Sequence, residues 1–143
     1  ATIAAYRGLL EVDPEDAGAI NDLAWILAHD KGEAGLAEAE PLATRGVTRY
    51  PADVHLLDTR GVILLKLRRY DDAQRDLEEC RRLAEAQPST RAAAALHLAQ
   101  VLAARGGDAS AVRTLVEEAR KIDDERRVLS DEDRAAMIKL LGS

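Results

Sequence analysis

Aromatic residues are nearly missing from this 143-residue sequence: they make up 3% of it, with one Trp, three Tyr and no Phe. Val, Ile and Thr are also few beside Ala and Leu. Because strands favour β-branched and aromatic side chains, this composition argues against an all-β fold. The only cysteine is Cys80, so the chain forms no intrachain disulfide, which fits a reducing compartment such as the cytoplasm.

The signatures of several functional classes are lacking as well. No apolar run approaches the roughly 20 residues of a membrane-spanning helix. Residues 1–16 lack the basic and apolar regions of a signal peptide, although a leader removed before Ala1 is compatible with the sequence. The net charge of −6 disfavours nucleic acid as a partner, because phosphate binding needs a dense basic surface. The sequence also has no phosphate-binding loop, paired-cysteine motif or HExxH motif, so we expect a non-catalytic protein without a cofactor or a metal ion.

Alanine and leucine are abundant instead. The chain contains 27 Ala and 20 Leu, which together make up a third of it, and both residues are strong helix formers. A hydrophobic fraction of 47% beside a charged fraction of 32% excludes a disordered segment. The composition therefore predicts an all-α fold, and it raises the question of how a core of mostly Ala and Leu packs well.

Three of the four prolines are evenly spaced, since Pro14, Pro51 and Pro88 lie 37 residues apart. Evenly spaced helix breakers are typical of a helical repeat. Small polar residues that are able to cap a helix follow each of these prolines. They are Asp16, Asp53, and Ser89 with Thr90.

Apolar residues at three- and four-residue spacing predict two amphipathic helices in each interval. The expected helices cover residues 17–29 and 36–48, 54–67 and 71–85, 91–105 and a segment after Gly106-Gly107-Asp108, with single helices at 3–12 and 131–141. A break is expected at 30–33. Pro41 then falls in or just past the first turn of its helix, where backbone amides have few intrahelical partners to lose.

The spacing of small and large apolar residues resembles the tetratricopeptide repeat, which alternates them on a helix pair and closes with a proline. The matching residues are Leu23, Ala24, Leu27, Ala39, Ala43, Gly46 and Pro51 in the first unit, Gly61, Leu64, Tyr70, Ala73, Leu77, Cys80 and Pro88 in the second, and Leu98, Ala99, Leu102, Val112, Val116 and Ala119 in the third. The resemblance covers about 120 residues, and its small residues suit close helix crossings.

This resemblance implies a right-handed α-solenoid of antiparallel helix pairs with about eight helices. It divides the chain into an array at 1–123 and a linker with a C-terminal capping helix at 124–143. Within the array, a half repeat at 1–14 precedes full repeats at 17–51, 54–88 and 91–123. The last helix caps the exposed end of the array or, alternatively, occupies its groove as an internal ligand.

In tetratricopeptide domains the first helix of each pair lines a concave peptide-binding groove. Projected onto this sequence, the groove residues are Asn21, Trp25, His55, Asp58, Val62, Leu65, Leu96 and Gln100. An exposed Trp in a groove is a typical binding hot spot, and the alternative is that Trp25 packs under a turn at 29–35. Lys and Arg are missing from these positions, which disfavours the clamping of a C-terminal carboxylate.

The resemblance therefore implies a protein-interaction scaffold that binds a peptide or a helix, and the acidic balance favours a neutral or basic partner. Two alternatives stay open at this point: a structural spacer or homo-oligomerisation module, and the C-terminal regulatory part of a larger enzyme or sensor. The helix at 3–12 offers an apolar edge of Ile3, Tyr6 and Leu10 through which a homodimer would form.

Single polar residues have structural interpretations. His29, His55 and His97 are expected to be solvated or capping residues rather than metal ligands, and Cys80 a small core residue. Arg60 stands where the repeat usually has a leucine. If Arg60 is buried it needs an acidic partner, because an unpaired buried charge is costly; otherwise its stem extends towards solvent.

Overall fold

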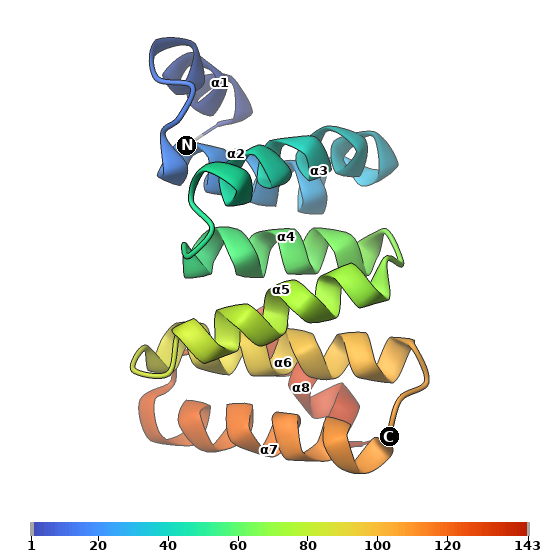
Figure 1. The fold of residues 1–143 in the computed structure, drawn as a ribbon. Helices are drawn as coiled ribbons and strands as arrows, with labels where there is room; N and C mark the ends of the chain where they lie inside the picture. The colour runs from blue at the N-terminus through green and yellow to red at the C-terminus, as the bar shows by residue number, and fades with distance from the viewer. Residues whose placement is uncertain (1, 143) are drawn as a thin grey trace.

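The computed structural model describes residues 2–142, and over this range the chain forms eight α-helices and no strand. The all-α fold of about eight helices that the sequence predicts is thereby confirmed. The helices are α1 (Ile3–Val12), α2 (Ala17–Asp30), α3 (Gly32–Arg49), α4 (Val54–Lys66), α5 (Tyr70–Leu83), α6 (Pro88–Ala104), α7 (Ala109–Arg126) and α8 (Asp131–Leu141). Figure 1 shows α1 to α7 stacked in succession along the molecule, whereas α8 lies behind α6 and α7.

The stack is built from helix pairs. Helix α2 packs against α3, α4 against α5, and α6 against α7, and contacts from α3 to α4 and from α5 to α6 join one pair to the next. The turn inside each pair is only a few residues long, so the two helices of a pair run in opposite directions. The buried apolar residues form three clusters along the stack, and each cluster takes side chains from more than one helix pair, because no pair can bury both of its apolar faces alone.

Side-chain caps fix where several helices begin. Asp16 accepts a hydrogen bond from the Ala19 amide, and Asp53 caps α4 in the same way. Ser130 likewise caps α8. The expected caps Ser89 and Thr90 are wrong, because α6 already begins at Pro88, which suits the first turn where an N–H has no partner.

A helix break lies within the expected range 30–33 but is shorter, at Lys31 alone, and the expected place of Pro41 is wrong. Helix α3 begins at Gly32, so Pro41 lies inside this 18-residue helix and removes one of its backbone hydrogen bonds. The tight corner depends on Gly35, where an added Cβ would lie 2.0 Å from the carbonyl oxygen of Leu27. The linker expected from residue 124 is also shorter, because α7 continues to Arg126.

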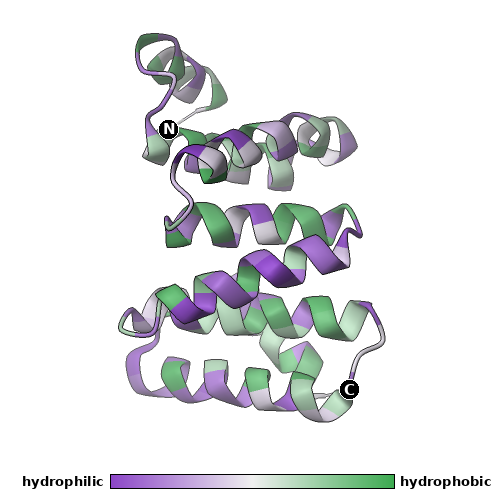
Figure 2. Ribbon diagram, in the orientation of Figure 1, coloured by the Kyte–Doolittle hydropathy of each residue, from purple (hydrophilic) through white to green (hydrophobic). Residues whose placement is uncertain are grey.

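Small residues bring the helices close together. Ala24, Ala39, Ala73, Ala99, Ala119 and Cys80 are fully buried. At Gly61 an added Cβ would lie 2.5 Å from Cγ of Leu77, and at Gly46 it would lie 2.8 Å from a methyl group of Leu56. An Ala- and Leu-rich core therefore packs densely, because the short residues lie where two helices cross. Figure 2 shows the complementary outer surface, with α5 largely hydrophilic on the side that faces the viewer.

Candidate interaction face

The first helices of the pairs form one side of the stack. Within residues 2–142, backbone contacts join α2 to α4 and α4 to α6, but none joins α3 to α5 or α5 to α7. Helices that approach each other on one side and diverge on the other make a curved stack. We call the side of α2, α4 and α6 that is turned away from α3, α5 and α7 the first-helix face, and it is the inner side of the curve.

Hydrogen bonds between side chains run along this face from helix to helix. They connect α1 to α2, α2 to α4, α4 to α6, and α6 to α8. The pairs are Tyr6 Oη–Asp22 (3.1 Å), Thr59 Oγ1–Asn21 (2.6 Å), His97 Nδ1–Asp58 (2.7 Å) and His97 Nε2–Asp133 (3.1 Å). We call this set of seven residues the polar ladder.

The two middle pairs of the polar ladder occupy equivalent repeat positions. Asn21 and Thr59 are 38 residues apart, and Asp58 and His97 are 39 apart. Each offset is one more than the spacing of the small residues that mark the repeat, which is 37 from Ala24 to Gly61 and 38 from Gly61 to Ala99. The residue three positions before one small residue, such as Asn21 before Ala24, is therefore hydrogen-bonded to the residue two positions before the next small residue, such as Thr59 before Gly61.

His97 carries the strongest electrostatic perturbation of the face. Its side chain is 5% exposed and lies between the carboxylates of Asp58 and Asp133. Burial acts to lower the pKa of His97, but the charges and hydrogen bonds of the two carboxylates outweigh it and raise the pKa to about 10. At neutral pH His97 is therefore an imidazolium whose two ring nitrogens both donate.

Helix α8 is held against this face at its start. Burial acts to raise the pKa of Asp133, but the hydrogen bond and charge of His97, with smaller contributions from Ser130 and His29, lower it. Arg134 donates to both carboxylate oxygens of Asp123 at the end of α7, and this pairing lowers the pKa of Asp123 to about 2. One turn further along, Met137 is 4% exposed within the core formed by α5, α6 and α7.

The predicted groove residues divide into two groups. His55 is exposed, and Asn21, Trp25, Asp58, Leu65 and Gln100 are half-buried. Val62 and Leu96 are 6% and 0% exposed, so the expectation that they line an open groove is wrong. Helix α4 is flanked by α2 and α6 on this side, which encloses Val62, and Leu96 belongs to the core cluster that also contains Met137 of α8.

Trp25 lies one turn after Asn21 on α2. Its ring is stacked on that of His29, with centroids 4.0 Å apart, and the Nδ1 atom of His29 is 2.8 Å from the Trp25 carbonyl oxygen. Residues four apart share one side of a helix, so Trp25 lies on the same side of α2 as Asn21, which bonds to Thr59 on the first-helix face. The alternative of a long turn above Trp25 is wrong, since only Lys31 separates α2 from α3.

Two charged residues that sequence reasoning missed, Asp76 and Asp133, organise the fold and the face. Asp76 holds Arg60 through two hydrogen bonds of 2.6 and 2.7 Å, so Arg60 has the acidic partner that burial requires. Asp133 and the predicted groove residue Asp58 hold His97, which makes the expectation of a solvated or capping His97 wrong. The repeat offset relates Asp58 to His97, whereas nothing local indicated Asp133.

The N-terminal edge also differs from expectation. Ile3, Tyr6 and Leu10 are half-buried against the core of α2 and α3. The apolar side chains that α1 leaves exposed are instead Leu9 and Val12, at 51% and 88%. Cys80 is a buried core residue as expected, and burial raises the pKa of its thiol to about 12.

No protein-family model matches the sequence, and no curated protein matches it either. In the part of the chain that the structure describes, no group of three or more His, Cys, Asp and Glu side chains is arranged to hold a metal ion. None of the helices between residues 2 and 142 combines the length and the apolar character needed to cross a membrane.

Proposed function

We propose that this chain is a tetratricopeptide-like scaffold that binds a peptide or a helix of a partner protein on the first-helix face. The repeat signature in the sequence supports the family resemblance, and the helix-pair architecture is compatible with it. The inner side of a curved helical stack is an extended surface that suits an elongated ligand.

The observation that carries the proposal is the half-buried Trp25, which is stacked on His29 one turn after Asn21 of the polar ladder. A rigid aromatic ring contributes a large contact area at a low entropic cost, and Trp is enriched among binding hot spots. Asn21, one turn before Trp25, accepts a hydrogen bond from Thr59, donates one amide hydrogen to Asp22 and retains the other for a ligand carbonyl. Asp22 and Asp58 make the same region acidic, which favours a neutral or basic partner.

The test is a selection of peptides from a random display library on the immobilised full chain, followed by affinity measurements. We expect Trp25→Ala to weaken binding of the selected peptides by tenfold or more, since a hot-spot residue contributes about 2 kcal/mol or more. Arg75→Ala is the matched control, because Arg75 is an exposed residue of α5 on the outer side. Equal losses in both variants, or no loss with Trp25→Ala, would count against the first-helix face as the site.

Self-association is the second candidate function. The exposed Leu9 and Val12 on α1 favour it, because adjacent large apolar side chains on an end helix are typical of an interface. Light scattering over a hundredfold range of concentration measures it. A mass that rises with concentration in the wild type and stays at 15.5 kDa in a Leu9→Glu, Val12→Glu variant supports this candidate. A constant mass of 15.5 kDa in the wild type contradicts it.

A further inference from the structure

Helix α8 does not continue the stack. A further first helix would lie beyond α7, at the end of the array, whereas Figure 1 shows α8 behind α6 and α7, and its contacts are with these two helices. Its first turn reaches the polar ladder, where Asp133 bonds to His97. The α6 part of the first-helix face is therefore covered by a helix of the same chain.

The docking of α8 is specific at its start and loose at its end. Asp133 and Arg134 each pair with a buried or half-buried charged group, and Met137 is enclosed in the core. Two of the remaining apolar residues are poorly covered, since Ile138 is 62% exposed and Leu141 39%, whereas Leu140 is half-buried against the core. Met137 is the only buried residue of the helix, so the apolar contact of α8 depends mainly on Met137 and Leu140.

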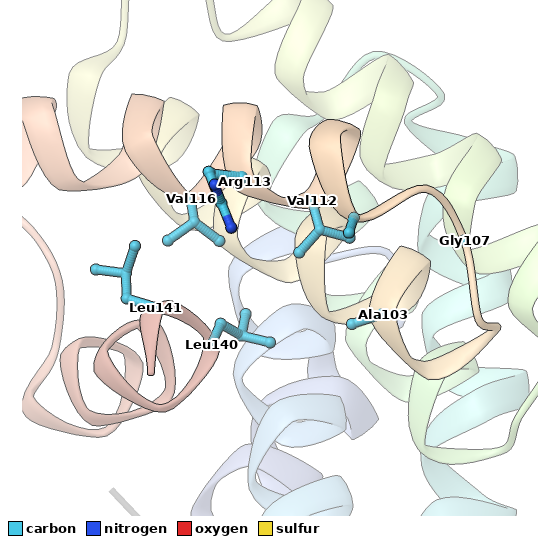
Figure 3. Close-up of a pocket in the computed structure, with 8 residues that line it drawn as sticks. Ala103, Gly107, Val112, Arg113, Val116, Leu140 and Leu141 are labelled. Carbon is cyan, nitrogen blue, oxygen red and sulfur yellow. The ribbon is translucent and has the colours of Figure 1, made fainter. Parts of the chain in front are cut away.

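A cleft lies under the second half of the helix. It encloses about 220 Å3 between the end of α6, the start of α7 and the end of α8. Figure 3 shows Val112 and Val116 of α7 facing Leu140 and Leu141 of α8 across it, with Ala103 at one side. Arg113 is the one charged residue among the mostly apolar side chains that line the cleft. Unfilled apolar space loses packing contacts, so a helix with larger apolar side chains at the positions of Leu140 and Leu141 would fit here better than α8 does.

We propose that α8 is an internal ligand of the first-helix face, and that an amphipathic partner helix displaces it. Like α8, this helix has an acidic first turn and otherwise neutral or basic polar side chains. Such a helix needs three features. It has a carboxylate in its first turn to bond with His97, a large apolar residue four positions later to replace Met137 in the core, and a further apolar residue to fill the cleft. This inference rests on the proposed function and adds the class of partner. It also makes α8 an autoinhibitory element, because the part of the first-helix face on α6 becomes accessible only when α8 leaves it.

A labelled synthetic peptide of residues 128–142 is the probe, and it is titrated into three full-length proteins. Met137→Asp places a charge in the core side of α8 and undocks it. Ile138→Asp, the matched control, places the same charge on the exposed side of the same helix. We expect the peptide to bind Met137→Asp at least tenfold more tightly than wild type or Ile138→Asp, because the tethered helix competes at an effective concentration in the millimolar range.

Met137→Asp could also disturb the fold of the other helices, so a second variant that undocks α8 is included. Asp133→Lys in the full chain sets a positive charge beside the His97 imidazolium and undocks α8 without altering the core. The same gain in peptide affinity is expected, and a peptide that itself carries Asp133→Lys should lose it. Equal binding to all the proteins, or no binding to either undocked variant while circular dichroism shows them helical, overturns the proposal.

The peptides selected on the first-helix face separate this inference from the proposed function. If Trp25→Ala abolishes their binding while Met137→Asp leaves their affinity unchanged, the binding face stands and α8 is a permanent part of the fold. If undocking α8 raises their affinity tenfold, both proposals are supported. If no library peptide binds the first-helix face although the peptide of residues 128–142 binds the undocked variants, the face accepts only its own helix and the proposed function fails.

Discussion

The crossing of α4 and α5 at Gly61 gives the sharpest test of how this core is packed. In the middle of an exposed helix, replacing Gly by Ala stabilises a protein by about 1 kcal/mol through helix propensity. At Gly61 the new methyl group would lie 2.5 Å from Cγ and 2.6 Å from Cδ2 of Leu77, distances that packed carbon atoms do not tolerate. Leu77 is 0% exposed, so it has no free space to move into. Relieving the overlap costs about 1–3 kcal/mol and opposes the gain in propensity.

Gly8 supplies the matched control, because no heavy atom lies within 4 Å of a Cβ added there, on the exposed surface of α1. The difference in the free energy of unfolding between Gly61→Ala and Gly8→Ala isolates the overpacking cost, and we expect Gly61→Ala to be less stable by about 1–3 kcal/mol. Urea unfolding followed by circular dichroism and by the fluorescence of Trp25 measures both variants. Adding Leu77→Ala should remove much of the penalty, as coupled neighbours do. A Gly61→Ala protein as stable as Gly8→Ala would refute the close crossing.

Four further predictions concern buried polar and small residues. Arg60→Leu leaves the Asp76 carboxylate buried without its partner and should lower the free energy of unfolding in urea by about 3 kcal/mol. The double variant Arg60→Leu, Asp76→Leu should recover most of this loss. A single variant as stable as the wild type contradicts the ion pair. The pKa of His97 is raised to about 10 in the folded protein, so the stabilisation that protonated His97 gives is complete below about pH 6.5 and is lost as the pH rises through 10. The difference in the free energy of unfolding between wild type and His97→Gln should therefore shrink over that range. The Cys80 thiol should react with a thiol reagent at pH 8 only on the timescale of unfolding, and fast labelling of the native protein argues against its burial. Ala73→Leu should lower stability by about 1–3 kcal/mol, and an unchanged melting temperature contradicts the repeat register.

Local signals predicted the helices well. Pro14 and Pro51 mark turns between helix pairs, and the aspartates that follow them, Asp16 and Asp53, cap α2 and α4. Periodic apolar residues then set which side of each helix is buried. These signals depend only on residues that are close together in the sequence, so they can be recognised without the structure.

Helix ends that depend on tertiary contact could not be predicted. Pro41 indicated a helix start, but α3 begins at Gly32 because the bare Gly35 fits against the backbone of α2 at Leu27. Helix propensity describes a single segment, so it cannot predict a helix start that depends on a close approach between two helices. Helix α7 likewise extends to Arg126, into the range expected as a linker, and near its end Asp123 accepts two hydrogen bonds from Arg134 of α8.

The candidate site was predicted in part, and the repeat explains which part. Positions that recur with the repeat, such as Asn21 and Asp58, lie on the first-helix face because each first helix has the same rotation in the stack. Leu96 has an equivalent position in the sequence, but α8 folds back and encloses it in the core. The bond between His97 and Asp133 depends on that same placement of α8, which breaks the repeat pattern.

The proposed function requires that the first-helix face is the surface that binds the partner. Backbone amide chemical shifts of the full chain, recorded while a selected peptide is titrated in, test this directly. The largest shifts are expected on α2 and α4 around Asn21, Trp25 and Asp58, and they should extend onto α6 when α8 is undocked. Shifts confined to α3 and α5, on the outer side of the stack, would contradict it.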